Sequence, residues 1–325
     1  MSNTKKKNKR FSLKGLILII LTILLLADLE GVLQQIDRAA NRWFQNTRNT
    51  SDAIVPYELY SSNAKLVRLA DDEVLLHVNS EEKIYPASLT KIMTAILAIE
   101  SLSSLEESVQ LNPALFPPLV AEGAAMAGFL PNEEVKAIDL LYGTLLPSGA
   151  EASVALAQLV SSSEETSGAL EQFVSSSEEQ FVANMNKKAA ELGMRNTHFT
   201  NPTGLHDEEH YSTIDDLTIL LQYALHNKQF KEIFTTTRYS TSVSSLHPDG
   251  ITIYSTLAEQ SDRMKLANGE IKGGKTGYTE RAGLCLATYA VINGEEYILI
   301  TAGADGNAHS EPYHLQDAIQ IYNLI

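Results

Sequence analysis

The chain has 325 residues, 44% of them hydrophobic, and a formal net charge of −15 at pH 7. The first fourteen residues hold six lysines and arginines and no acid, so the rest of the chain is still more acidic. This balance excludes nucleic acid as the expected partner, and the apolar fraction excludes a disordered chain. The single cysteine, Cys285, excludes an intramolecular disulfide and offers no metal cluster.

The amino terminus is typical of a targeting segment. An uncharged apolar run from Leu16 to Ala27 follows the basic stretch and ends at Asp28. It is shorter than the about 20 residues of a membrane helix, as in a signal peptide, but no small-x-small cleavage pattern follows promptly. We expect residues 1–29 to be a signal peptide or membrane anchor and 30–60 a spacer, with the following residues outside the cytoplasm. A buried globular helix is the alternative.

From residue 61 onward the pattern runs strands, helices, strands. Residues 64–69 and 73–78 predict a hairpin that turns at Asp71-Asp72, and apolar periodicity predicts mostly helices over 100–230. Strand patterns return at 239–256, at 285–292 and at 296–303 around the Asn293-Gly294 turn, before a last helix over 312–325. We therefore predict an α/β (α+β) fold, with an antiparallel sheet built from both chain ends and an inserted helical lobe over about 89–230.

The helical lobe contains a repeat. Residues 158–165 (Gln-Leu-Val-Ser-Ser-Ser-Glu-Glu) recur as 172–179 with one substitution, at an offset of 14 residues. This offset is close to four helical turns, so the insertion can lengthen a helix or loop without rotating the next segment of the chain. We interpret residues 161–174 as a tandem duplication on the surface; a functional acidic patch is the alternative.

A Ser-x-x-Lys string places Ser88 and Lys91 three residues apart. Three other matches, at Ser2, Ser62 and Ser80, lack its setting between Pro86 and the apolar run 92–99. At a helix start this spacing brings the two side chains onto one face, where an amine of lowered pKa can take the serine proton. A capping serine with a solvated lysine is the alternative. Two further strings complete the pattern: Ser148-Gly149-Ala150 and Lys275-Thr276-Gly277.

These strings carry a resemblance. Residues 86–94, 145–149, 184–205 and 273–279 resemble the D-alanyl-D-alanine carboxypeptidases, the low-molecular-mass penicillin-binding proteins. The resemblance covers residues 61–325 and implies a serine β-lactamase and penicillin-binding-protein fold. It implies a bacterial enzyme on the outer face of the cell membrane or secreted to the wall. The carboxyl-terminal domain of many members is expected to be missing, which leaves membrane attachment to the amino terminus.

The resemblance also implies roles. Ser88 would attack the penultimate carbonyl of a peptidoglycan stem peptide, Lys91 would be the base, and Ser148 would pass a proton to the departing D-alanine. Lys275 would lower the pKa of Lys91 as a second cation and, with Thr276, bind the terminal carboxylate; the backbone N–H groups of Ser88 and Tyr278 would form the oxyanion hole. Gly274 and Gly277 would let the substrate backbone approach. β-Lactams would acylate the same serine, and neither cofactor nor metal is expected.

Position 150 departs from the family pattern. Members usually have Ser-x-Asn in the second motif, whereas this chain has Ala150 followed by Glu151. Lys91 would then be held by the Ser148 hydroxyl, a water or a backbone carbonyl, and the chain would be a slower enzyme or a non-catalytic wall-binding protein. A class A β-lactamase lacks support because Ser-Asp-Asn is missing. A zinc peptidase lacks a His-Glu-x-x-His helix, so His206–His210 is predicted to be a hydrated loop.

Overall fold

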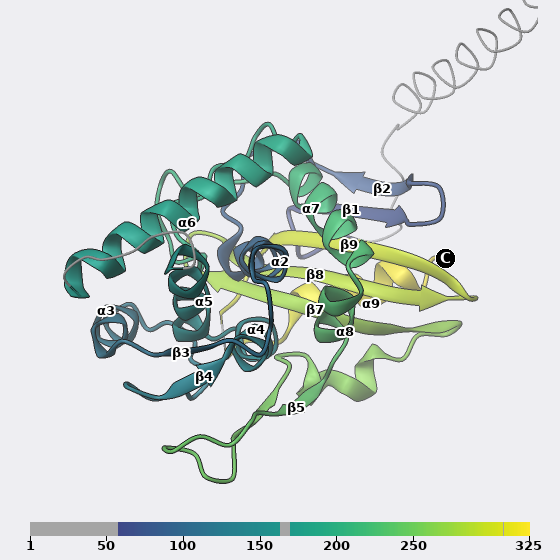
Figure 1. The fold of residues 1–325 in the computed structure, drawn as a ribbon. Coiled ribbons are helices and arrows are strands. Elements are labelled where there is room, and N and C mark those ends of the chain that lie inside the picture. Colours follow the sequence, from purple (N-terminus) through teal and green to yellow (C-terminus); the bar gives the residue numbers. More distant parts are fainter. Residues whose placement is uncertain (1–57, 163–169, 308) are drawn as a thin grey trace, which may run out of the picture. The chain divides into compact units, whose positions relative to one another are not determined.

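The fold is organised around a five-stranded antiparallel sheet of order β2-β1-β9-β8-β7 (Figure 1). This computed structural model describes residues 58–162, 170–307 and 309–325. The strands of the sheet are β1 (Asn63–Arg68), β2 (Glu73–Val78), β7 (Gly269–Thr279), β8 (Gly283–Ile292) and β9 (Glu295–Ala304). The first two strands come from the start of the described chain and the other three from its end. The predicted assembly of one sheet from both chain ends is therefore observed.

Both predicted hairpins form. In β1–β2, Leu66 lies opposite Leu76, and Asp72 in the turn has a φ of 56°. In β8–β9, Asn293 and Gly294 have φ values of 53° and 84°. Two successive residues in the left-handed region match the twist of antiparallel strands, which explains the Asn-Gly pair at this turn.

Helices cover both faces of the sheet. They are α2 (Lys91–Ser101), α3 (Phe116–Ala121), α4 (Ala137–Leu145), α5 (Ala150–Ser162), α6 (Leu170–Leu192), α7 (Ile214–His226), α8 (Lys228–Phe234) and α9 (Tyr313–Tyr322). Three short 3-10 helices accompany them: η1 (Ala87–Thr90), η2 (Pro113–Leu115) and η3 (Ala258–Met264). Two small two-stranded sheets pair β3 (Ser108–Gln110) with β4 (Glu134–Lys136) and β5 (Arg238–Ser240) with β6 (Thr252–Tyr254).

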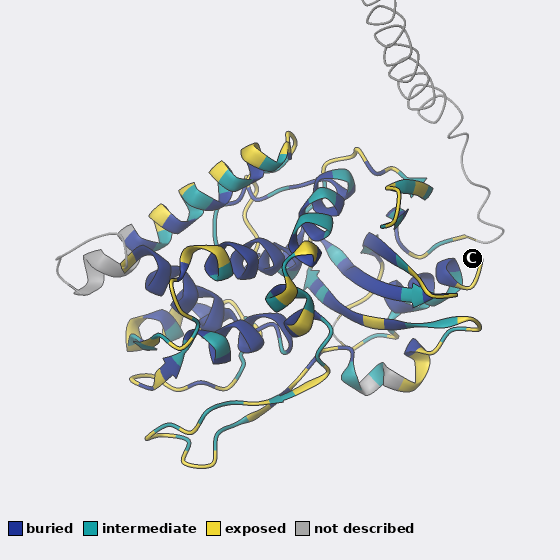
Figure 2. Ribbon diagram, turned by 45° about the vertical axis from the view of Figure 1, so that its right-hand side comes forward, coloured by how far each residue is buried: buried dark blue, intermediate teal, exposed yellow. Residues whose placement is uncertain are grey.

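Helix α2 lies at the centre of the larger core. Its residues 91–98 are all buried, and it contacts α4, α5, α6, α7 and α8 (Figures 1 and 2). A helix that is apolar on every side is stable only when neighbours cover every side, so the apolar run that follows Ser88 explains this position. The residues at the start of α2 are therefore positioned by a helix that is packed on every side.

A second core lies on the opposite face of the sheet, under α9. Leu315, Ala318 and Ile321 of α9 pack there against Leu286 and Leu299 of β8 and β9. The predicted final helix is thus confirmed. Cys285 points to the larger core, is fully buried and has a pKa raised to about 12 by burial, as expected of a small core residue.

The predicted strand over 239–256 is wrong in its middle. Only β5 and β6 pair, and the chain between them forms a loop in which the Glu133 carboxylate accepts hydrogen bonds from Ser244 Oγ (2.6 Å) and His247 Nδ1 (2.8 Å). Gly250 has a φ of 67°, and Pro248 lacks the N–H that a central strand would need. Val243 and Leu246, in the middle of the predicted strand, are exposed.

Part of the predicted organisation lies outside the described residues. This holds for the targeting segment 1–29, most of the spacer 30–60 and the middle of the duplication, residues 163–169. The first copy of the repeat begins near the end of α5, and the second copy lies in α6. The two helices contact each other, and Ser161 Oγ donates a hydrogen bond to the Ser177 carbonyl (2.7 Å). Within the described part of the chain, no helix combines the length and apolarity needed to cross a bilayer.

Candidate active site

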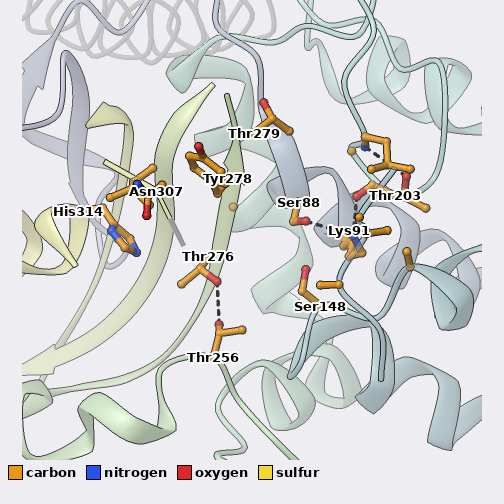
Figure 3. Close-up of a pocket in the computed structure, with 18 of the residues that line it drawn as sticks. Ser88, Lys91, Ser148, Thr203, Thr256, Thr276, Tyr278, Thr279, Asn307 and His314 are labelled. Carbon is orange, nitrogen blue, oxygen red and sulfur yellow. Dashed lines mark hydrogen bonds between the residues drawn. The ribbon is translucent and has the colours of Figure 1, made fainter. Parts of the chain in front are cut away.

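The predicted site residues converge on one cleft of about 780 Å³ between strand β7 and the helical lobe (Figure 3). Ser88, Lys91, Ser148, Thr276, Gly277 and Tyr278 line this cleft. Lys275, the remaining predicted residue, is fully buried in β7. Three strings that lie far apart in the sequence therefore build one site.

Ser88 lies in the 3-10 turn η1 directly before α2, whereas Lys91 is the first residue of α2. Lys91 Nζ is 3.1 Å from Ser88 Oγ, within hydrogen-bond reach. Ala87 has a φ of 47°, an uncommon conformation for a residue with a side chain. A Cβ on Gly204 would lie 1.9 Å from the Ala87 carbonyl oxygen, so only glycine fits against this turn. The backbone around the serine is thus fixed by a close contact from the segment around Gly204.

A backbone carbonyl holds Lys91. Its Nζ donates to the Thr203 carbonyl oxygen at 2.5 Å. The Asn201 side-chain oxygen in turn accepts from the N–H groups of Thr203 (3.1 Å) and Gly204 (2.8 Å), which shapes this turn. Of the three partners left open by the sequence, the described structure therefore contains the backbone carbonyl. Residues 184–205 were singled out only by resemblance, and their link to Lys91 was not predicted.

The Lys91 amine is poised to act as a base. The side chain is 2% exposed, and burial lowers its pKa to about 7. Burial and the neighbouring Lys91 charge lower the pKa of Lys275, because two buried ammonium groups repel each other. A large share of Lys91 is therefore neutral near pH 7, and a neutral amine can accept the proton of Ser88.

Ser148 lies in a tight turn before α5. Its φ is 67°, it is 5% exposed, and within the described structure its Oγ has no hydrogen-bond partner. The turn is held by hydrogen bonds from Gly149 N to the Gly143 carbonyl and from Ala150 N to the Ala125 carbonyl, both 2.8 Å. This strained turn leaves a free hydroxyl on the cleft wall opposite β7.

Strand β7 forms the other wall. Lys275 Nζ donates to the Thr276 carbonyl (2.8 Å), and Thr276 Oγ1 donates to Thr256 Oγ1 (2.8 Å). A Cβ on Gly277 would lie 3.1 Å from the Ser88 nitrogen, so this glycine keeps the space beside the serine open. Gly274 was predicted to leave room for the substrate backbone, but the space it leaves is filled by the sheet itself. A Cβ added at this position would lie 2.6 Å from the Ala287 carbonyl oxygen of β8.

The prediction of a hydrated loop at His206–His210 is wrong for His210. This side chain is 2% exposed, and its two ring nitrogens contact Thr90 Oγ1 (2.8 Å) and the Thr200 nitrogen (3.1 Å). Burial lowers its pKa to about 4, so the ring is neutral and links the start of α2 to the segment that carries Thr203. Across the described chain, no three His, Cys, Asp or Glu side chains group as metal ligands would.

Glu151 is a site residue that the sequence did not identify. The side chain is fully buried, and its Oε1 accepts hydrogen bonds from the N–H groups of Ala127 (2.6 Å) and Gly128 (2.9 Å). These bonds fix the segment before them, including Ala124 and Ala125 of the cleft wall. The carboxylate also raises the pKa of Lys91 against the lowering by burial. Its only signal in the sequence was a charge beside Ala150 in an apolar helix.

We expect Glu151→Gln to shift the acidic limb of the pH profile of acylation to lower pH. Glutamine keeps an oxygen for the two N–H groups but removes a negative charge that stabilises the Lys91 ammonium, so the Lys91 pKa falls. Lys275 and the neutral His210, the other titratable groups near Lys91, are unchanged. The measurement is the rate of acylation by a chromogenic β-lactam across pH. Glu122→Gln, at an exposed position of the cleft rim, is the control, and an unmoved limb in Glu151→Gln would contradict this role.

Ala150 lines the cleft and is almost fully buried. We expect Ala150→Asn to raise the acylation rate by up to about tenfold, or about 1.4 kcal/mol, because the amide adds a hydrogen-bonding group near Lys91 and the substrate. Stopped-flow acylation of the two proteins measures this. Slower acylation by a folded Ala150→Asn protein would show that the cleft is adapted to the smaller side chain, with Lys91 sufficiently held by Thr203.

The sequence profile described as D-alanyl-D-alanine carboxypeptidase matches residues 48–166 and 158–306. The two matched segments overlap at residues 158–166.

Among curated relatives, the Bacillus subtilis D-alanyl-D-alanine carboxypeptidase DacF is 32% identical over 75% of this chain and 57% of its own length. An Escherichia coli D-alanyl-D-alanine endopeptidase is 30% identical over 77% of this chain and 73% of its own. The chain thus spans little more than half the length of the Bacillus relative.

Solved structures share the fold. The crystal structure of a Streptomyces DD-transpeptidase superposes with a TM-score of 0.69 at 26% identity, over 82% of this chain and 97% of the other. A Mycobacterium tuberculosis D-alanyl-D-alanine carboxypeptidase gives a TM-score of 0.65 at 24% identity, over 84% of this chain and 93% of the other. The predicted fold class is confirmed, and the chain belongs to the D-alanyl-D-alanine carboxypeptidase family.

Proposed function

We propose that this protein is a serine-type D-alanyl-D-alanine carboxypeptidase that removes the terminal D-alanine of peptidoglycan stem peptides through an acyl-enzyme. The observation that carries the proposal is the pair Ser88 and Lys91, 3.1 Å apart, with the lysine amine buried and its pKa lowered to about 7. A nucleophile beside a base of matched pKa is the basic unit of serine acyl transfer. Family membership supplies the substrate class.

In this proposal, acylation proceeds as follows. Ser88 Oγ attacks the carbonyl carbon of the penultimate D-alanine while neutral Lys91 takes its proton. The N–H groups of Ser88 and Tyr278 would stabilise the oxyanion. The Ser148 hydroxyl, which has no hydrogen-bond partner in the described structure, would turn toward Lys91 to pass the proton to the departing amine. The C–N bond then breaks, and D-alanine leaves with that proton.

Deacylation repeats the steps with water. Lys91, neutral again, takes a proton from a water molecule, which attacks the ester carbonyl and restores Ser88. A β-lactam would acylate Ser88 by the same route, but its opened ring stays attached. Penicillin therefore reports the first half of the reaction alone.

Recognition of the carboxyl end would involve Thr276 and Lys275. Thr276 Oγ1 faces the cleft, where it donates to Thr256, and it can turn to donate to a carboxylate instead. Lys275 is fully buried and its amine donates a hydrogen bond to the Thr276 carbonyl. It would therefore support the position of Thr276 and does not itself line the cleft. The basic amino terminus with its apolar run supports placement on the outer face of a bacterial membrane or in the wall.

The test is incubation of residues 58–325 and of the full chain with a pentapeptide stem, followed by mass analysis. We expect the loss of one alanine from the wild type and an unchanged peptide with Ser88→Ala. A protein that takes up penicillin on Ser88 but leaves the pentapeptide intact would instead be a non-catalytic penicillin-binding protein. Hydrolysis and release of the penicillin at catalytic rates would indicate a β-lactamase-like hydrolase.

A further inference from the structure

His210 is a buried histidine to which the proposed reaction assigns no step. The three residues before it are exposed acids, yet its own side chain is 2% exposed. The ring packs edge-on against Phe199, with 5.6 Å between the ring centroids. The next residue, Tyr211, exchanges two backbone hydrogen bonds with His198. The fold therefore holds this imidazole in one place.

The hydrogen bonds of the His210 ring define its tautomer. The backbone N–H of Thr200, which can only donate, lies 3.1 Å from Nδ1, so Nδ1 is the unprotonated nitrogen. The proton of the neutral ring is then on Nε2, which donates to Thr90 Oγ1 at 2.8 Å. The imidazole is thus a bridge that accepts a hydrogen bond at one end and donates one at the other.

This bridge joins the two segments that surround the Lys91 amine. Thr90 is fully buried and directly precedes Lys91 at the start of α2. Thr200 lies three residues before Thr203, whose carbonyl oxygen accepts from Lys91 Nζ at 2.5 Å (Figure 3). The two ends of the imidazole are therefore held by the segment that carries the amine and by the segment that carries its carbonyl partner.

A second contact keeps the same two segments together further along α2. Thr94 Oγ1, also fully buried, donates to the Pro202 carbonyl at 2.7 Å. Thr94 lies one helical turn beyond Thr90, so the two contacts attach the segment to α2 at successive turns. The bond from Lys91 to Thr203 depends on this attachment, because a misplacement of about 1 Å in a reacting group can cost about 10²-fold in rate.

We propose that His210 is a positioning residue for the general base. By joining Thr90 to Thr200 it sets the distance between the Lys91 amine and the Thr203 carbonyl, and this contact orients the amine toward Ser88. His210 touches neither the substrate nor the reacting atoms, so it acts through Lys91. The inference rests on the proposed function, because it uses the same serine and lysine pair.

The test compares two substitutions of His210. His210→Gln offers one acceptor and one donor on a single side chain, whereas His210→Leu fills the space and makes neither bond. Stopped-flow acylation over a range of chromogenic β-lactam concentrations gives the maximal acylation rate separately from the affinity of the first complex. We expect His210→Leu to lower the maximal rate at least about tenfold with an unchanged affinity, and His210→Gln to restore most of the rate.

His198→Leu is the matched control. His198 is exposed, and its Nδ1 contacts the Glu209 carbonyl, so the maximal rate should be unchanged. The final extent of labelling, measured by mass spectrometry, counts the folded protein, and a fold defect would lower this extent. A wild-type maximal rate in His210→Leu, or an equal loss of rate in both His210 variants, would overturn the positioning role and leave the proposed function intact.

Thr90→Val breaks the same bridge from its other end. Valine has the shape of threonine but no hydroxyl, so it cannot accept the proton of His210 Nε2. We expect a loss of maximal rate similar to that of His210→Leu, and no further loss in the double variant, because the two changes remove one contact. Should His210→Leu fail to fold, an unchanged rate in Thr90→Val would overturn the role. A wild type that takes up no β-lactam would overturn the proposed function instead.

Discussion

We expect Ser88→Ala to abolish covalent labelling by penicillin. The hydroxyl oxygen is the atom that forms the ester, whereas Ser148, on the opposite wall of the cleft, has no hydrogen-bond partner among the described residues and thus no base that activates it. Intact-protein mass spectrometry of the wild type should show one added penicillin, located on the peptide that contains Ser88. The alanine variant should keep the unlabelled mass even after long incubation.

Ser148→Ala is the matched control for this experiment. It removes a hydroxyl from the opposite wall of the same cleft but leaves the pair of Ser88 and Lys91 intact. We expect it to be labelled on Ser88, more slowly than the wild type because the proton relay is missing. An adduct on Ser148, or one that persists in Ser88→Ala, would refute the assignment of the nucleophile.

Lys91→Met should lower the acylation rate by about 10²–10⁴-fold, the usual contribution of a positioned general base. Methionine has a similar length and suits the buried position, but it cannot accept the Ser88 proton. The protein should stay folded by circular dichroism, because the substitution removes an amine that is costly to bury. The rate is measured by stopped-flow acylation with a chromogenic β-lactam.

The control for lost charge is Lys188→Met. Lys188 forms a surface ion pair with Glu100 at 2.8 Å, and removing it should leave the rate unchanged. A folded Lys91→Met protein with a wild-type acylation rate would show that another group activates Ser88.

Much of the fold could be predicted because its signals are local. The Asn293-Gly294 turn identifies the β8–β9 hairpin from two residues, and the apolar run after Ser88 marks α2 as a buried helix. The loop between β5 and β6 shows the limit of this reasoning. Residues 239–256 have the composition of one strand, but the hydrogen bond of His247 to Glu133, from a distant part of the chain, holds the middle of this stretch as a loop.

The reactive residues Ser88 and Lys91 could also be predicted from nearby sequence, whereas the residues that hold Lys91 and Glu151 in place could not. Ser88 and Lys91 are three residues apart, so their contact follows from the backbone. The carbonyl that holds Lys91 belongs to Thr203, and the amides that hold Glu151 belong to Ala127 and Gly128, in segments without regular periodicity. Such contacts depend on how loops meet in three dimensions. The burial of His210 escaped prediction for the same reason, since its neighbours in sequence are exposed acids.

The pH dependence of Ser88 acylation tests the central claim most directly, namely that Lys91 activates the serine as a neutral amine. Because the Lys91 pKa is lowered to about 7 and the base must be unprotonated, the wild-type rate should rise as pH increases through about 7 and level off above it. In Lys91→Met this rise should be lost. A wild-type rate that is flat through neutral pH, or that falls as pH increases, would contradict the account.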